Sequence, residues 1–152
     1  MCDRCNGMSE RQIRERQKLR IARYGYTMTW VEPSPTSEPF GYTVGLTEKK
    51  HPELLISGLW SDYTAEFLNA FAHGVAAHGE VIKPGLLPVT AERDLYVLEV
   101  EHPACVMVNA YGLYKWRVTG LQLVWPDEQG KYPWAPDAEP GHQVLFGAPP
   151  RL

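Results

Sequence analysis

Residues 40–59 read FGYTVGLTEKKHPELLISGL, and this stretch decides the fold. Phe40 to Leu46 and Leu54 to Leu59 are rich in apolar and β-branched residues, and a polar segment separates them. That arrangement is typical of two strands joined by a loop. The run from Leu54 to Gly58 is almost continuously apolar, so we expect its strand to be central and covered on both faces.

The segment that follows predicts the clearest helix, over Tyr63 to His78. Its apolar residues recur at helical spacing, and we expect Leu68 and Ala72 to face the core. Ser61 or Asp62 is a suitable N-cap, and Gly79 is a suitable stop. Burial by this helix and the strand pair should therefore build the fold.

Further elements are predicted on both sides of this centre. A capping box at Ser9 and Gln12 begins a helix over Glu10 to Tyr24 that Gly25 ends. A stretch at 104–111, opened by a proline, favours a helix over a strand. Strands are expected at 26–31, 95–101 and 121–125, an edge segment or loop at 81–89, and a return hairpin strand at 131–134.

This order predicts an α+β fold with a mostly antiparallel sheet and two or three helices. The 152 residues suit a single domain. We divide it into an N-terminal segment with a basic helix (1–24), a core (25–136) and a tail rich in Pro and Gly (137–152).

The net charge of −3 hides an asymmetry along the chain. Residues 1–24 hold seven basic and three acidic residues, a net charge of +4, and the remainder carries −7. A basic arm on an acidic body could bind nucleic acid or an acidic partner. The basic residues lie on every side of the helical wheel rather than in one stripe, which argues against nucleic acid. We therefore expect the arm to dock on the body of its own chain or of a second copy.

Composition also bears on location. No apolar run is long enough to span a membrane, and the polar N-terminus lacks the apolar stretch of a secretory signal. We expect a cytoplasmic protein whose three cysteines are reduced.

Three stretches together resemble a known family. They are Phe40 to Leu46, His51 to Leu55 running on to Gly58-Leu59, and Gln122 to Asp127 followed by Gly130 and Pro133-Trp134. With an N-terminal Cys-x-x-Cys, the chain resembles the bacterial and phage family of domain of unknown function 4262 over residues 20–136. The resemblance implies a single cytoplasmic domain and assigns no functional residue.

Cys2-Asp-Arg-Cys5 is the sharpest local motif. Two thiolates at this spacing can share one zinc ion, but a closed site needs four ligands. We name His51 and His102 as candidate partners; His102 lies three residues before Cys105, which could also contribute. Redox chemistry at the Cys-x-x-Cys, or two ordinary thiols in a frayed terminus, are the alternatives.

Two other chemistries have weaker support. Trp60, Ser61, Thr64 and Trp125 are candidate cofactor-binding residues, because the start of the second helix could meet a phosphate beside aromatic rings. His51 beside Glu53 could act as a general base, whereas Ser57 is better read as a core serine.

The sequence leaves three functions open. The first, which we favour, is a small binding or regulatory domain with a protein partner or self-association, with a possible zinc ion at Cys2 and Cys5. The second is an enzyme that binds flavin or another cofactor. The third is a metal-dependent hydrolase. Whether the protein is an enzyme is not decided by any motif.

Overall fold

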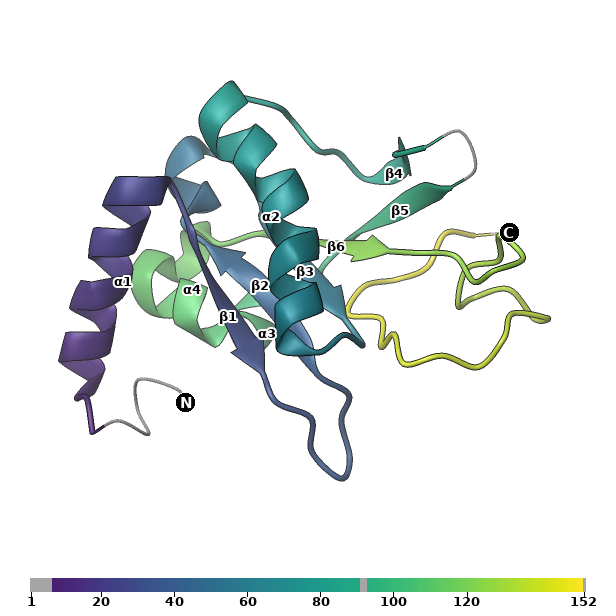
Figure 1. Cartoon of the computed structure of the whole chain (residues 1–152), viewed down its shortest axis with the longest axis horizontal. Helices are drawn as coiled ribbons and strands as arrows, with labels where there is room; N and C mark the ends of the chain where they lie inside the picture. The colour runs from purple at the N-terminus through teal and green to yellow at the C-terminus, as the bar shows by residue number, and fades with distance from the viewer. Residues whose placement is uncertain (1–6, 91–92, 152) are drawn as a thin grey trace.

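A six-stranded mixed sheet forms the centre of the computed structural model, which describes residues 7–90 and 93–151 (Figure 1). The strand order is β1-β2-β3-β6-β5-β4. β3 and β6 run parallel, and the other neighbouring pairs are antiparallel. The expected α+β class with a mostly antiparallel sheet is confirmed. The strands are β1 (Thr27–Val31), β2 (Phe40–Val44), β3 (Glu53–Ser57), β4 (Gly85–Pro88), β5 (Asp94–Glu99) and β6 (Gly120–Val124).

The apolar run of β3 places this strand at the middle of the sheet. All five of its residues are buried, and it pairs with β2 on one side and β6 on the other. Leu54 and Ile56 point to one face of the sheet, and Leu55 points to the opposite face. The sheet is therefore covered on both faces, as the continuous hydrophobicity of this strand predicted.

Helix α2 (Ser61–His78) covers one face of the sheet (Figure 1). Leu68 and Ala72 are fully buried against β3 and β6, as predicted. Gly79 ends the helix in the left-handed conformation. The predicted N-cap was wrong: the N-cap is Trp60, and no side chain caps the helix there. Trp60 keeps an extended backbone while its carbonyl accepts the first helical bond, from Thr64, which places Ser61 and Asp62 inside the first turn.

Two short helices lie against the opposite face. They are α3 (Pro103–Val106) and α4 (Val108–Tyr114), and a 3₁₀ turn, η2 (Lys115–Arg117), follows directly. The single helix expected at 104–111 is thus two helices, because Met107 leaves the helical conformation with φ −100° and ψ 65°. The fully buried Met107 side chain fills the core on this face.

Helix α1 (Glu10–Tyr24) stands beside the β1 edge of the sheet (Figure 1). Ser9 and Gln12 form the predicted capping box, and Gly25 ends the helix with φ 90°. Of its residues only Ile21 is buried. The helix therefore attaches along a narrow face and leaves most of its surface in solvent.

The chain after β6 returns across the face of the sheet opposite α2. We call residues 142–147 the C-terminal strap. Phe146 packs with Phe40 at a ring-centroid distance of 4.9 Å, and the Phe146 carbonyl accepts the backbone N–H of Glu101. The predicted hairpin strand at 131–134 was wrong: Tyr132 and Trp134 instead stack on each other and pack edge-on against Tyr96 of β5.

No helix in the described part of the chain has the length and apolar character needed to cross a membrane.

The close approach of the C-terminal strap to β5 gives a first prediction. A Cβ atom added at Gly147 would lie 2.0 Å from the Glu99 carbonyl oxygen, and a backbone atom cannot move cheaply. Gly147→Ala should lower the free energy of unfolding by about 1–3 kcal/mol in urea denaturation. Gly141→Ala is the matched control, since nothing lies within 4 Å of its added Cβ. Equal effects of the two variants would contradict this packing.

Candidate functional site

The carboxylate of Glu53 is the most deeply buried charged group in the described structure. Its side chain has 0% exposure. Oε1 accepts hydrogen bonds from Thr43 Oγ1 at 2.8 Å and from the Leu46 N–H at 3.0 Å. Oε2 accepts from the Gly45 N–H at 3.1 Å, and from the N–H and hydroxyl of Thr47 at 3.0 and 2.6 Å. Five donors thus surround one carboxylate.

The backbone between β2 and the 3₁₀ turn η1 (Leu46–Lys49) makes this arrangement possible. Gly45 has φ 132°, and three successive N–H groups then point at one spot, a geometry that favours an anion. Burial raises the pKa of Glu53, whereas the donors around it act to lower that pKa. No lysine or arginine in the described residues forms an ion pair with it, so hydrogen bonds alone satisfy this carboxylate.

His51 ties the same turn to the segment after α2. Its Nδ1 lies 2.7 Å from the Pro52 carbonyl oxygen, which can only accept, so Nδ1 carries the proton. Nε2 accepts a hydrogen bond from the Ile82 N–H at 3.0 Å. Both ring nitrogens of His51 therefore have structural partners, and a metal would have to replace one of these bonds. The predicted roles of His51 as base or ligand stay predictions.

Ser57 and Gln122 anchor the C-terminal strap to the face of the sheet opposite α2. Gln122 donates from Nε2 to the Val144 carbonyl at 2.7 Å and accepts the Phe146 N–H at 2.7 Å. Ser57 Oγ lies 2.9 Å from both the N–H and the carbonyl oxygen of Val144. Ser57 is 1% exposed, which confirms the interpretation of a core serine.

Asp127 organises the turn that precedes the strap. Its carboxylate accepts backbone N–H groups of Glu139, Lys131 and Gln129 at 2.9 to 3.0 Å. These bonds hold the pKa of Asp127 below its ordinary value, and the bond from the Glu139 N–H has the largest effect. Asp127 is thus a turn residue.

The predicted cofactor-binding residues lie around the start of α2 and the end of β6. Trp60 is 63% exposed and its ring lies 6.1 Å from that of Trp30. Thr64 is buried, and its hydroxyl bonds the Leu59 carbonyl at 3.2 Å. Trp125 pairs instead with Phe67, at 6.4 Å. Ser61 is exposed in the first turn of the helix. Trp60 and Trp125 therefore belong to different aromatic contacts.

The predicted metal ligands are only partly described. Cys2 and Cys5 lie outside the described residues. His102 is exposed, with a left-handed backbone at φ 54°, and Cys105 is exposed beside it. Among residues 7–90 and 93–151, no three His, Cys, Asp or Glu side chains gather closely enough to hold an ion.

A groove of about 500 Å³ opens where α1, η1, α4 and η2 meet. Basic side chains from three of these elements, Lys18, Lys49 and Arg117, line it together with Glu48. Its remaining lining is apolar or aromatic, namely Ile21, Ala22, Leu113 and Tyr114. We call it the basic groove.

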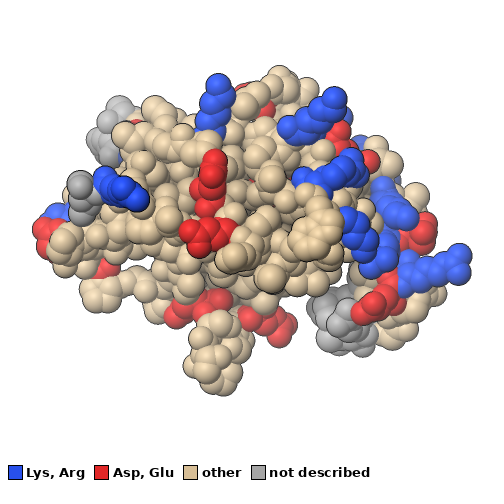
Figure 2. Space-filling model, turned by 180° about the vertical axis from the view of Figure 1, so that it is seen from behind, with Lys and Arg blue, Asp and Glu red and all other residues tan. Residues whose placement is uncertain are grey.

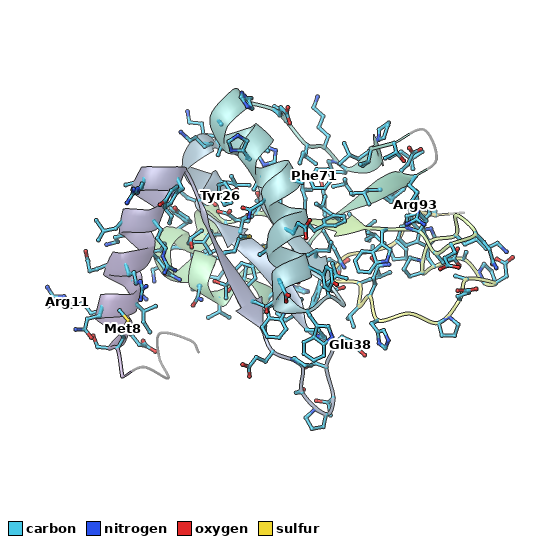
Figure 3. The ribbon with its side chains drawn as sticks, in the orientation of Figure 1. Met8, Arg11, Tyr26, Glu38, Phe71 and Arg93 are labelled. Atoms are coloured by element: carbon cyan, nitrogen blue, oxygen red, sulfur yellow. The ribbon has the colours of Figure 1, made fainter. Side chains whose placement is uncertain are left out.

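The basic groove belongs to a wider basic surface on α1. Lys and Arg side chains gather on the α1 side of the molecule (Figure 2). Arg11 points away from the sheet (Figure 3). No carboxylate among the described residues pairs with the guanidinium groups of Arg11, Arg14, Arg20 or Arg23, all of which are exposed. Arg14 lies against Gly112 of α4, so the surface continues from α1 onto α4.

Reasoning from the sequence missed the roles of Glu53, Gln122 and the groove. Glu53 carried one signal, a carboxylate at the start of an apolar strand close to a Gly and two Thr residues. The groove gave no signal in the sequence, because its basic residues lie in segments far apart along the chain.

The comparisons with known proteins identify a family for this chain. The family model described as Domain of unknown function (DUF4262) matches residues 20–139. The search of curated proteins and the search of solved structures each gave no match. Residues of the three stretches that carried the resemblance, such as Glu53, Gln122 and Asp127, are those that make the internal hydrogen bonds described above.

The Glu53 carboxylate gives a second prediction. In Glu53→Gln an amide NH₂ would face backbone donors, leaving at least two of them without an acceptor. We expect a loss of about 2–4 kcal/mol in the free energy of unfolding, measured by urea denaturation. Glu66→Gln, an exposed change on α2, is the control and should shift the midpoint little. An unchanged midpoint for Glu53→Gln would show that the five bonds contribute nothing.

Proposed function

The chain belongs to the family described as Domain of unknown function (DUF4262), and we propose that this member is a binding domain for an acidic segment of a partner protein. The observation that carries the proposal is the basic surface on α1. That surface stands on a protein whose overall net charge is −3. An acidic ligand would therefore be steered to one side of the molecule.

The packing of α1 supports this role. The helix attaches by a narrow face around Ile21, so most of its residues are exposed to solvent, where a partner could reach them. Leu19 and Tyr24 are also exposed on it, at 71% and 63%. The Arg23 guanidinium lies 5.3 Å from the Tyr24 ring centroid, a cation–π contact that orients both groups. Apolar and basic groups side by side suit an acidic peptide that also carries apolar side chains.

The charge distribution favours a short acidic segment over nucleic acid. Residues 25–152 carry a net charge of −7. A long nucleic acid would extend from α1 across this acidic body, whereas a short peptide would meet only the local surface. Charges farther away than about 10 Å are largely screened at ordinary salt concentrations.

Self-association would rely on the same attraction between opposite charges, because residues 25–152 of a second copy carry a net negative charge that could contact the basic helix. A cytoplasmic location, predicted from the sequence, fits either partner. We regard the separate protein partner as the primary proposal, and an oligomeric state measured by light scattering distinguishes the two.

The test is binding of a short fluorescent Glu- and Leu-containing peptide, followed by anisotropy. Arg11→Gln combined with Arg20→Gln should weaken binding by about threefold to tenfold, because two exposed charges are lost. Lys83→Gln combined with Arg93→Gln removes the same charge elsewhere on the surface and should change the affinity little. Raising the salt concentration should weaken binding of the unaltered protein.

Three outcomes would overturn this proposal. They are no peptide binding, equal losses in the two double variants, or tighter binding of a single-stranded oligonucleotide than of the peptide. A stable dimer of the unaltered protein that releases monomers in the Arg11 and Arg20 double variant would assign the surface to self-association instead.

The zinc ion at Cys2 and Cys5 is a separate proposal that the spacing of the motif supports. In this role the ion would stabilise the N-terminal segment that precedes α1, with His102 or His51 as further ligands. His102 is the easier donor, since both nitrogens of His51 already have partners.

Elemental analysis of protein purified without a histidine tag checks the zinc proposal. We expect close to one equivalent of zinc per chain, and loss of that zinc in a Cys2→Ser, Cys5→Ser variant. Cys105→Ser is the control for a general thiol effect. Less than about a tenth of an equivalent in the unaltered protein would exclude the site.

A further inference from the structure

We infer that the basic groove binds a phosphate monoester, either on a side chain of the acidic partner segment or on a small molecule. This inference deepens the proposed function, because the groove is part of the basic surface. Its lining provides three cations and one carboxylate, a net charge of +2. A phosphate monoester at pH 7 carries about −1.5 to −2, so the two charges match.

The groove has the size and lining of a ligand site. Its volume of about 500 Å³ lies in the range of small-molecule pockets. Ile21 and Leu113 supply apolar wall, and Tyr114 adds an aromatic ring. Such a wall would contact the carbon body of a phosphate ester while the cations contact its oxygens.

Two of the cations have no acidic partner of their own. The described residues offer no carboxylate within ion-pair distance of Lys49 or Arg117. Lys18 has one, Glu15, at 3.7 Å on the exposed surface of α1, and such pairs contribute little. An incoming phosphate would therefore gain three cationic contacts without breaking a strong ion pair. Arginine adds a planar fork of donors that fits phosphate oxygens.

Contacts with the rest of the protein position Arg117, Glu48 and the backbone of η1. The Arg117 guanidinium lies 5.4 Å from the Tyr114 ring centroid, and the Tyr114 hydroxyl donates to Glu48 at 2.8 Å. Burial and the nearby Glu48 charge raise the pKa of Tyr114, so its hydroxyl keeps the proton it donates. Lys49 sits on η1, whose second residue, Thr47, is fixed by the buried Glu53 carboxylate. The Arg117 and Glu48 side chains and the η1 backbone are thus in place before a ligand arrives, which lowers the cost of ordering them on binding.

The carboxylate of Glu48 allows a test in which binding of a phosphate ester should become tighter. Among the described residues that line the groove it is the one carboxylate, and it would repel a bound phosphate. Glu48→Gln keeps an oxygen that can accept the Tyr114 hydroxyl but removes this repulsion. That variant should therefore bind phosphate esters more tightly, whereas loss of a groove cation should weaken binding.

The experiment is titration with phenyl phosphate, followed by amide chemical shifts in NMR spectra of the full chain. Arg117→Gln and Lys49→Gln should each weaken binding by about tenfold, and Glu48→Gln should tighten it by about twofold to fivefold. Lys83→Gln, outside the groove, should leave the affinity unchanged. Phenol, which lacks the phosphate, should not bind. Thermal unfolding of each variant verifies that the fold is retained.

Two peptides then distinguish the sources of the phosphate. If the ligand is a phosphorylated side chain, the Glu- and Leu-containing peptide with one phosphoserine should bind at least about tenfold more tightly than its unmodified form. If both peptides bind equally while phenyl phosphate binds in the groove, the ligand is a small phosphate ester.

Failure of this inference differs from failure of the proposed function. The inference that the groove binds a phosphate monoester would be contradicted if phenyl phosphate did not bind at all. It would also be contradicted if Arg117→Gln and Lys49→Gln left the affinity for phenyl phosphate unaltered. The unmodified acidic peptide could still bind through Arg11 and Arg20 in that case. If the protein bound phenyl phosphate but not the acidic peptide, the proposal of an acidic partner segment would be wrong. The inference that the groove binds a phosphate monoester would still stand.

Discussion

The buried carboxylate of Glu53 is the constraint on which the rest of the structure depends. Taking an ionised carboxylate out of water costs several kcal/mol unless hydrogen bonds replace its hydration. Here Thr43, Gly45, Leu46 and Thr47 supply five of them, at 2.6 to 3.1 Å. The connection between β2 and β3 therefore has one geometry in which the charge is satisfied. That geometry sets the position of η1 and the pairing of the two strands at the centre of the sheet.

Both faces of the sheet are covered by apolar packing, and one of them also receives hydrogen bonds from the C-terminal strap. α2 binds by apolar packing, with Leu68 and Ala72 against β3 and β6. On the opposite face, Ser57 and Gln122 hold the C-terminal strap by hydrogen bonds to its backbone. The strap is thus kept in place both by Phe146, which packs on Phe40, and by backbone groups that find partners inside the fold.

The hydrogen-bonding residues in the three stretches that resemble the family are different from the residues that line the basic groove. Glu53, Gln122 and Asp127 make internal hydrogen bonds and maintain the fold. The basic groove lies on the surface, and Glu53 is connected to it through Thr47 and η1. A shared fold can thus be maintained while surface residues adapt to a partner, and for that reason family membership alone does not define the ligand.

Local patterns in the sequence determined the elements and the class of the fold. The capping box bounded α1, the spacing of Leu68 and Ala72 gave α2 and its buried side, and the apolar run at Leu54 identified the central strand. These signals are local, because capping and hydrophobic periodicity act over a few residues. The same locality explains the errors, since the break at Met107 and the edge-on packing of Tyr132 against Tyr96 are set by tertiary packing.

Only the tertiary structure decided which distant residues meet. Lys18, Lys49 and Arg117 lie far apart along the chain and line one groove because α1, η1 and η2 converge there. Likewise, the sequence placed a serine and a glutamine in apolar strands, but their partner is the backbone of a segment at 142–147. Contacts across such separations depend on the complete packing of the chain, and no local pattern in a single sequence records them.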